Sequence, residues 1–397
     1  MSESKQRNTW MLVYTLYPYD SRVRREAESV AALQGHDVRV LCLKEEETPR
    51  TYELQGVTVD ELNVPKYRGK GAGRYVFSYL VFLGHGFLAV SRSFFRGKVD
   101  IVHVHNMPNF IVFSALLPKI FGKKIILDIH DTLIETYAAK FAGKDLKWKL
   151  LYSILRFEEY VSCWFADNII CVNEIQRQKL VDRGIKETKI TVIKNVPDSK
   201  YFDYKRTIVE KKEGGFRLVY HGTVAYRQGT DLAILAVNRI KENIEGLTFL
   251  VMGEGDDWRA NIELVQELDA QESVFFKKAV PVEELASILE DADLGIIPNR
   301  RSIASELMLP VKMLEYVALG IPVVVPKLKT IQHYFTDEMV YYFDPDDDVA
   351  LANAILSAYG DKEGRSAKAL RAKSFYEKFG WDLHKDRLLN LYRQPKK

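Results

Sequence analysis

The stretch Leu309-Pro-Val-Lys-Met-Leu-Glu-Tyr-Val-Ala-Leu-Gly-Ile-Pro-Val-Val-Val325 decides the fold and also points to a function. It places Lys312 and Glu315 near the start of a short apolar helix that ends at Gly320, and residues 321–325 are typical of a buried parallel strand. A helix N-terminus offers unpaired N–H groups and a positive dipole end, so it can hold a diphosphate. A glutamate one turn further in can accept hydrogen bonds from a ribose diol. The segment therefore predicts a nucleotide-diphosphate site, and the alternative is an ordinary helix and strand of an α/β domain.

Strands and helices alternate along most of the chain, which indicates parallel sheets covered on both faces. The pattern predicts strands at 10–16, 38–43, 57–62, 101–104, 124–129, 168–172, 217–220, 247–252, 274–277 and 294–298, and helices at 22–34, 75–95, 109–121, 146–165, 174–183, 230–241, 258–269 and 282–292. The alternation breaks at 195–215, where proline, charge and paired glycines are typical of a linker. We therefore expect two doubly wound domains, 1–198 and 199–378. No G-x-G-x-x-G follows the first strand, which disfavours a nicotinamide site.

Composition limits the classes of partner. The 397 residues carry a formal net charge of +3, too small to indicate nucleic-acid binding. Cys42, Cys163 and Cys171 are too few and too scattered for a disulfide framework or a zinc site, and each lies in an apolar run. The first residues lack a secretory hydrophobic region, so we expect a cytoplasmic protein.

Residues 75–90 form an apolar and aromatic run that needs separate treatment. No charge lies between Arg74 and Arg92, but the run is shorter than a bilayer-spanning helix of about 20 apolar residues. We expect a helix packed on a sheet. The alternative is shallow contact with the inner membrane surface, which basic flanking residues would favour over a plain solvated rim: Lys66, Arg68, Lys70, Arg74, Arg92, Arg96 and Lys98.

Polar residues follow several strands of the second half, at the sheet edge where parallel sheets bind ligands. Gly222 lets a ligand approach the backbone, Thr223 can donate to an oxyanion, and Arg227 can place its guanidinium on phosphate oxygens. Gly253 follows the next strand, in what is first a turn and second a cleft-lining loop. Lys277 ends a further strand, where its backbone either reads a nucleobase edge or belongs to a plain loop.

In the first half, His130 follows a predicted strand and can hydrogen-bond a sugar hydroxyl, or it can be a satisfied loop histidine. Asp20 and Arg22 open a helix after the first strand, where they can meet an acceptor or form part of the helix surface. His103 and His105 share one strand face, as metal ligands do. No third ligand type gathers near them in the sequence, so we favour structural roles and expect no metal.

Familiar catalytic motifs do not occur: there is no nucleophile elbow, no P-loop and no H-E-x-x-H. The acidic run Asp346-Asp347-Asp348 follows a proline and precedes a helical pattern, so we interpret it as a helix N-cap.

Taken together, the motifs resemble family-four retaining glycosyltransferases of the GT-B type, over nearly the whole chain. The resemblance rests on the order and spacing of several segments: 14–20 with Gly35-His36-Asp37-Val38, Asp100-Ile-Val-His-Val-His105, Asp128-Ile-His130, Ala166-Asp167-Asn-Ile-Ile170, Val192-Ile-Lys-Asn195, His221-Gly222-Thr223 with Arg227, Gly253-Glu-Gly255, Ala292-Asp293, Lys312-Met-Leu-Glu315 and Gly320-Ile-Pro-Val323.

The resemblance implies two Rossmann-like domains facing across a cleft, with the terminal helix at 379–397 crossing back onto the first. It implies transfer of a sugar from a nucleotide-diphosphate donor to a sugar or lipid-linked acceptor, with retention of the anomeric configuration and neither metal nor cofactor. Glu315 would hold the ribose, Arg227 and Lys312 with the Val311 amide would hold the diphosphate, and His130 would contact the donor sugar. Cations aimed at a leaving diphosphate stabilise the charge that develops on it.

Two departures from the family pattern stand out. Leu307 occupies the position where the family often has a second glutamate, and Glu306 is one residue away. Thr223 and Gln228 stand where an arginine and a lysine are common. The leading hypothesis is a glycosyltransferase of polysaccharide, lipopolysaccharide or glycolipid assembly, located either free in the cytoplasm or as a peripheral protein at the inner membrane face. Two alternatives stay open: a nucleotide-sugar epimerase or hydrolase, and a non-catalytic nucleotide-sugar-binding subunit.

Overall fold

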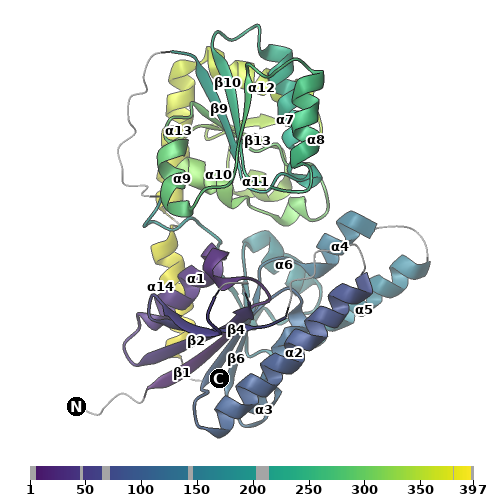
Figure 1. Cartoon of the computed structure of the whole chain (residues 1–397), viewed down its shortest axis with the longest axis vertical. Coiled ribbons are helices and arrows are strands. Elements are labelled where there is room, and N and C mark those ends of the chain that lie inside the picture. The colour runs from purple at the N-terminus through teal and green to yellow at the C-terminus, as the bar shows by residue number, and fades with distance from the viewer. Residues whose placement is uncertain are drawn as a thin grey trace. The chain divides into compact units, whose positions relative to one another are not determined.

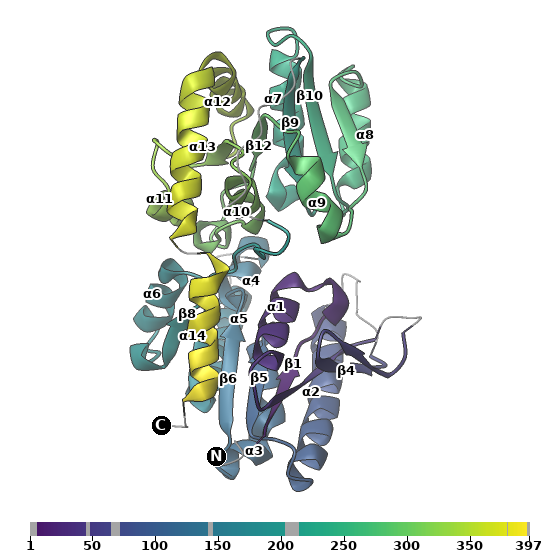
Figure 2. The same ribbon diagram turned by 90° about the vertical axis from the view of Figure 1, so that its left-hand side faces the viewer.

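The computed structural model describes residues 6–44, 48–64, 72–141, 146–202, 214–378 and 380–394. The chain forms two compact units (Figures 1 and 2). Unit 1 comprises Met1–Asn195 together with Asp382–Lys397, and unit 2 comprises Val196–Trp381. The last segment of the chain thus belongs to the first unit.

Unit 1 is built on an eight-stranded sheet of order β3-β4-β2-β1-β5-β6-β7-β8, in which only β3 and β4 pair antiparallel. Its strands are β1 (Arg7–Leu12), β2 (His36–Leu43), β3 (Thr51–Leu54), β4 (Val57–Leu62), β5 (Ile101–His105), β6 (Lys124–Ile129), β7 (Asn168–Cys171) and β8 (Ile190–Val192). The central strands β5, β6 and β7 are buried along nearly their whole length, as parallel strands covered on both faces are.

Helices cover both faces of this sheet. They are α1 (Ser21–Ala31), α2 (Ala72–Phe95), α3 (Leu116–Ile120), α4 (Leu133–Phe141), α5 (Leu146–Phe165), α6 (Glu174–Asp182) and α14 (Trp381–Arg393), with 3-10 turns η1 (Tyr17–Tyr19), η2 (Asn109–Ala115) and η3 (Glu187–Lys189). α1 and α14 lie on one face, and α2 and α5 lie on the other (Figures 1 and 2). Phe82 and Val90 of α2 are fully buried against Trp10, Leu12 and Val104 of the sheet.

Unit 2 is built on a six-stranded, all-parallel sheet of order β11-β10-β9-β12-β13-β14. Its elements are β9 (Phe216–His221), η4 (Tyr226–Gln228), α7 (Thr230–Ile240), β10 (Leu247–Met252), α8 (Trp258–Glu267), β11 (Val274–Lys277), α9 (Val282–Leu289), β12 (Leu294–Ile296), η5 (Ser305–Leu307), α10 (Val311–Ala318), β13 (Val323–Pro326), α11 (Lys329–Tyr334), β14 (Tyr341–Phe343), α12 (Asp348–Gly360) and α13 (Lys362–Glu377). In both units the chain runs strand, helix, strand, so the carboxyl ends of the strands share one edge of each sheet.

The predicted α/β class and doubly wound sheets are confirmed, with differences at particular elements. The expected terminal helix at 379–397 is α14, which runs from Trp381 to Arg393, and α13 precedes it. Asp347 caps α12 by accepting from Ala350 N at 2.9 Å, as the acidic run predicted. The predicted linker lies largely outside the described residues.

Helix α2 is longer than the apolar run in the sequence suggested. The 23 residues Gly73–Phe95 are long and apolar enough to cross a bilayer by length and composition alone. The same helix nevertheless packs one side on the sheet: a Cβ at Gly86 would lie 2.9 Å from the Leu12 side chain. The expected packing of this helix on a sheet is therefore confirmed for one of its faces.

Candidate functional site

The strand ends of unit 2 bring Lys312 of α10 onto the loop that follows β9. Its Nζ donates to the Tyr220 hydroxyl at 2.8 Å and to Gln228 Oε1 at 3.4 Å. A Cβ on Gly222, which has φ +109°, would lie 3.2 Å from the same Nζ, so a bare glycine leaves room for the lysine. Pro310 precedes α10 and provides no side-chain cap, which leaves the first N–H groups of the helix without a capping side chain. A cation and a helix N-terminus thus meet at one point.

The residues around Lys312 shift the pKa of its amino group. Burial lowers the pKa of its amino group to about 7, while Glu315 raises it and Arg227 lowers it further. Arg227 lies in the exposed turn η4, close enough to act on both Lys312 and Tyr220. An anion placed between the two cations would restore the charged form of Lys312. Sequence reasoning predicted that these two side chains lie close together.

Glu315 lies one turn further along α10 and is held by residues that the sequence did not indicate. Its Oε2 lies 2.6 Å from His221 Nε2, and His221 Nδ1 lies 2.8 Å from the Tyr316 hydroxyl. The Glu315 side chain keeps 15% of its surface exposed. One carboxylate oxygen is therefore fixed by His221, and the other is available to a ligand diol.

Two glycines allow the loops after β9 and β10 to touch. Gly253 has φ +152°, and a Cβ on it would lie 1.8 Å from the Gly222 carbonyl oxygen. A Cβ on Gly255 would lie 2.0 Å from the Val224 carbonyl oxygen. Gly253 therefore lies at the expected place beside Gly222, where backbone packing between the loops requires glycine.

Of the other predicted donor-binding residues of unit 2, some are open to a ligand and some already have partners. Thr223 is exposed beside Gly222, and Val311 is the first residue of α10. Lys277 ends β11. Its carbonyl oxygen accepts a hydrogen bond from Gly253 N at 2.9 Å, so it holds the loop after β10 in place. Leu307 is buried, and the neighbouring Glu306 forms an ion pair with Arg301 at 3.1 Å. Glu306 is thus engaged elsewhere and does not replace the family glutamate.

In unit 1, His130 follows β6 and is oriented by a buried carboxylate. Its Nε2 lies 2.9 Å from Asp128 Oδ2, and its backbone N donates to Asn106 Oδ1 at 2.8 Å. The Nδ1 atom of His105 lies 3.2 Å from both Asp128 Oδ2 and His130 Nε2. The His130 side chain is 20% exposed, so its ring is fixed on one side and reaches the surface on the other.

Arg22 differs from the expectation of a residue open to an acceptor. Its guanidinium is buried and donates to Asp128 Oδ1 at 2.6 Å and to Glu26 Oε1 at 3.1 Å. Burial would raise the Asp128 pKa, but Arg22 and His130 hold it well below its usual range. The physical reason is that α1 turns Arg22 inward onto the sheet, where its guanidinium is occupied by Asp128 and Glu26 and does not face an acceptor. Asp20 is the N-cap of α1, accepting from Val23 N at 3.1 Å.

The residues around His103 and His105 differ from the expectation that no third type of metal ligand lies near them. Glu26 and Asp128 gather beside them, with one ligand-type atom from each of the four residues within 4.8 Å of the others. The missing third ligand type is therefore present in space, although not in sequence. Arg22, however, already lies between the two carboxylates, so their charge is compensated by a guanidinium. Burial also holds the pKa of His103 well below its usual range, and its Nδ1 lies 2.6 Å from the Tyr392 hydroxyl.

Comparison with known proteins identifies both units. Residues 21–200 match the family model for glycosyltransferase family 4, and residues 215–361 match that for glycosyl transferases group 1. A sucrose-phosphate synthase from Thermosynechococcus elongatus superposes with a TM-score of 0.79 at 18% identity, covering 98% of this chain and 99% of that one. Anabaena Alr3699/HepE in complex with UDP and glucose gives 0.71 at 11% identity, covering 98% and 100%.

Among curated proteins, the amylovoran biosynthesis glycosyltransferase AmsK of Erwinia amylovora is 22% identical over 195 residues, or 48% of this chain and 47% of the relative. The chain thus spans about half the length of this relative. The two family matches follow the two-unit division, and the solved neighbours share the whole architecture. The chain therefore belongs to the family-four glycosyltransferases and has their GT-B fold.

Proposed function

We propose that this protein transfers a sugar from a nucleotide-diphosphate donor to a sugar or lipid-linked acceptor in the assembly of a polysaccharide, lipopolysaccharide or glycolipid. The observation that carries the proposal is the convergence of Lys312, Arg227 and the N-terminus of α10, with Glu315 fixed one turn away. This set provides positive charge for a diphosphate and a carboxylate for a ribose. The name of AmsK, an amylovoran biosynthesis glycosyltransferase, and the UDP in Anabaena HepE support the same class of reaction.

The chemistry follows from where charge develops. Cleavage of the bond between the anomeric carbon and the diphosphate leaves negative charge on the departing oxygen. The ammonium of Lys312, the guanidinium of Arg227 and the Val311 N–H would receive that charge. His130, oriented by Asp128, would contact the donor sugar from unit 1. We propose that the reaction retains the anomeric configuration and needs no cofactor. We also propose that it needs no metal, because side chains supply the cations.

We further propose that α2 brings the enzyme into shallow contact with the inner face of the membrane, where a lipid-linked acceptor would be presented. A cytoplasmic, peripheral location agrees with the one-sided packing of α2. Three basic residues of the predicted flank, Lys66, Arg68 and Lys70, lie outside the described residues.

A donor panel tests the transfer. Nucleoside diphosphate released from UDP-sugars or GDP-sugars in the presence of acceptor is the expected result, unaffected by a metal chelator. Lys312→Ala and Arg227→Ala should each lower the rate by about a hundredfold, the usual loss for one group that stabilises developing charge. NMR of the first-formed product should show the anomeric configuration of the donor.

Two results would redirect the assignment. Steady free sugar or epimer without acceptor would favour the hydrolase or epimerase alternative. Tight nucleotide-sugar binding with no turnover, changed by Arg227→Ala only in affinity, would favour a binding subunit.

A further inference from the structure

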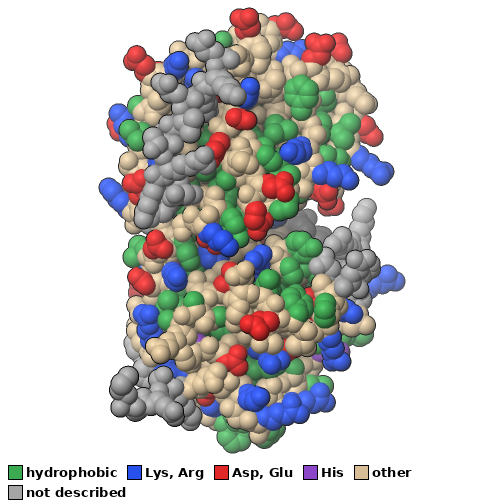
Figure 3. Space-filling view, turned by 60° about the vertical axis from the view of Figure 1, so that its left-hand side comes forward, with side chains coloured by type: hydrophobic (Ala, Val, Ile, Leu, Met, Phe, Trp, Pro, Cys, Tyr) green, Lys and Arg blue, Asp and Glu red, His purple; other side chains and the backbone are tan. Residues whose placement is uncertain are grey.

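Large apolar side chains are exposed mainly on one part of unit 1. Of the 22 exposed large hydrophobic residues among those that the structure describes, 14 lie on α2, α5, or α3 and the residue after it. They are Val76, Phe77, Leu80, Leu88, Phe95, Leu116, Ile120, Phe121, Leu150, Tyr152, Ile154, Phe157, Tyr160 and Trp164. On the side of the molecule seen in Figure 3, by contrast, acidic and basic side chains are interspersed and hydrophobic ones form small separate groups. Such a concentration of apolar surface marks an interaction site.

Helical spacing places these side chains on the outer face of each helix. On α2, exposed residues recur at 77, 80, 84, 88, 92 and 95, and on α5 at 150, 154, 157, 160 and 164. Steps of three and four residues keep them on one side, opposite the buried residues that pack on the sheet. Phe77, Phe157 and Trp164 are 68%, 71% and 69% exposed.

The two helices and α3 belong to one layer. Both α2 and α5 pack against η2, which continues into α3, and all three cover the same face of the sheet (Figure 1). Their outer sides therefore form one apolar surface of unit 1, which we call the α2–α3–α5 face and define by the 14 residues above. The segment 146–165 adds an aromatic half that the α2 sequence alone did not indicate.

The charge of this face is of one sign. Helix α2 contains no acidic residue, and the two glutamates of α5 point inward: Glu158 accepts from Phe110 N at 2.7 Å, and Glu159 pairs with Arg183 at 2.8 Å. Arg74, Arg92 and Lys149 are exposed on the same helices. An apolar surface bordered by cations without anions is complementary to a bilayer that contains anionic lipids.

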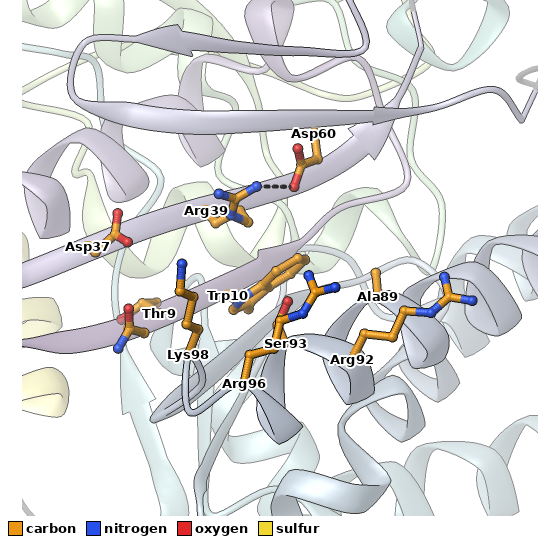
Figure 4. A pocket seen from close by; sticks show the side chains of 11 residues that line it. Thr9, Trp10, Asp37, Arg39, Asp60, Ala89, Arg92, Ser93, Arg96 and Lys98 are labelled. Carbon is orange, nitrogen blue, oxygen red and sulfur yellow. Dashed lines mark hydrogen bonds and ion pairs between the residues drawn. The ribbon is translucent and has the colours of Figure 1, made fainter.

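A pocket of about 300 Å³ lies at the C-terminal end of α2 (Figure 4). It is lined on the helix side by Arg92, Arg96 and Lys98, which make no side-chain ion pair or hydrogen bond with the residues that the structure describes. Across from them, Arg39 pairs with Asp60 at 2.7 Å and lies 5.6 Å from the centre of the Trp10 ring. Four cations against Asp37 and Asp60 leave the pocket positive.

The strand residues of this pocket come from the sheet face that carries α2. Asn8 and Trp10 of β1 pair with Asp37 and Arg39 of β2, and side chains two residues apart in a strand share a face. The pocket lies at the strand N-termini, at the opposite end of the sheet from His130. It is therefore separate from the donor-sugar contact proposed above.

We propose that the α2–α3–α5 face docks on an anionic lipid bilayer and that the pocket formed by Arg92, Arg96 and Lys98 takes the phosphate of a lipid headgroup. Arg92 belongs to both, because it continues the exposed stripe of α2 and lines the pocket. The proposal extends the contact of α2 proposed above to a three-helix surface with a headgroup site. Its test does not depend on transferase activity.

Vesicle co-sedimentation of the full chain without nucleotide tests the docking face. We expect binding to phosphatidylcholine vesicles that contain about a third phosphatidylglycerol, and weaker binding to phosphatidylcholine alone. Binding to the anionic vesicles should weaken as salt rises. The double variant Phe77→Ser/Phe157→Ser should lower binding to anionic vesicles at least about tenfold. The matched control Phe275→Ser/Leu370→Ser removes apolar side chains that are 46% and 57% exposed elsewhere, and it should bind as the parent does.

Charge reversal tests the pocket separately. Arg92→Glu/Arg96→Glu should lower binding to anionic vesicles about tenfold or more and leave binding to phosphatidylcholine nearly unchanged. Arg259→Glu/Lys378→Glu makes the same change of net charge at exposed positions of unit 2 and should have little effect. Circular dichroism with thermal melting should show that all four variants fold as the parent does.

Three outcomes would overturn the proposal. No binding to either vesicle, with folded protein, would exclude a bilayer. A dimer by sedimentation equilibrium that Phe77→Ser/Phe157→Ser converts to monomer would show that a second copy of this chain covers the face. Binding of Arg92→Glu/Arg96→Glu to anionic vesicles as tight as that of the parent would show that the pocket takes no headgroup phosphate. None of these results bears on whether nucleoside diphosphate is released from donors.

Discussion

Lys312 shows how one residue can report the binding of an anion. In the free protein, burial lowers the pKa of its amino group to about 7, so above that pH it is mostly neutral. A bound diphosphate favours the ammonium form and raises that pKa. Binding above pH 7 therefore takes up a proton, and the affinity for UDP or GDP should fall as pH rises from 7 to 9, by up to about tenfold per unit. Below pH 7 the amino group of Lys312 is already charged in the free protein, so it should add no pH dependence to the affinity.

Calorimetry in buffers of different ionisation enthalpy measures this uptake directly. Lys312→Met keeps the length of the side chain without its charge, so it should abolish the proton uptake and flatten the pH dependence. Arg227→Met removes a cation that stays charged in this range, so it should weaken binding. It also removes a charge that lowers the pKa of Lys312, so the fall in affinity should begin at a higher pH. Proton uptake unchanged in Lys312→Met would assign the titration to another group.

His221 gives a second prediction, because it fixes Glu315 from the carboxyl end of β9. Loss of the 2.6 Å contact in His221→Ala would leave the carboxylate free to rotate away from a ribose. A charge-assisted hydrogen bond contributes about 1.5–3 kcal/mol, so we expect the Kd for UDP to rise at least about tenfold. Pyrophosphate has no ribose, so its Kd should stay the same. Equal weakening of both ligands would contradict an orienting role for His221 at the ribose.

These residues also show what could be predicted from the sequence at this scale. Lys312 and Glu315 were predicted because they are neighbours on one helix, where spacing determines which side chains share a face. His221 and Tyr316 were missed as partners because their contact joins residues 95 positions apart. Arg22 was misassigned for a related reason: a charged residue in a helix is normally exposed, and only its buried partner Asp128, 106 positions away, turns it inward.

At the scale of elements, the loops after β9 and β10 depend on glycine. Gly253→Ala would place a Cβ 1.8 Å from a backbone carbonyl at φ +152°, where neither atom can move cheaply. We expect a loss of at least about 3 kcal/mol in the free energy of unfolding, or failure to fold. Chemical denaturation measures it.

Gly84→Ala is the matched control for this substitution. Gly84 lies inside α2, and a Cβ there would meet nothing within 4 Å. Alanine is the better helix former, so this variant should be neutral or more stable by up to about 1 kcal/mol. A Gly253→Ala variant as stable as Gly84→Ala would show that the two loops do not pack as described.

Buried strands were predicted most accurately of all elements. The bounds of β4, β6, β10 and β11 agree with the predicted ranges, since at least half of the residues of each strand are apolar and turn residues flank it. The strands β3, β8 and β14 were missed; each is three or four residues long and lies at a sheet edge. The exposed aromatic side of α5 was also missed, since an apolar residue in a helix is ordinarily interpreted as core.

At the scale of the whole molecule, each unit has its own core, and the chain passes between them twice, near residues 195 and 381. The described core of unit 1 is built from residues between 10 and 192, and that of unit 2 from residues between 216 and 358. Helix α14 completes unit 1: Leu388 and Tyr392 are fully buried, and Lys194 N donates to His384 Nδ1 at 3.4 Å. A single chain with two cores is expected to unfold in more than one step.

Differential scanning calorimetry should therefore resolve two transitions with separate responses. Leu388→Ala leaves a cavity in unit 1 and should lower the midpoint temperature of only one transition, with a loss of about 2–5 kcal/mol in the free energy of unfolding of that unit. UDP or GDP at a hundred times its Kd should raise only the other, by about 2.7 kcal/mol, because the proposed diphosphate contacts all lie in unit 2. NAD should raise neither. A single transition that responds both to Leu388→Ala and to the nucleotide would show that the units unfold together. If two transitions occurred and the nucleotide stabilised the one that Leu388→Ala lowers, the assignment of nucleotide binding to unit 2 alone would be wrong.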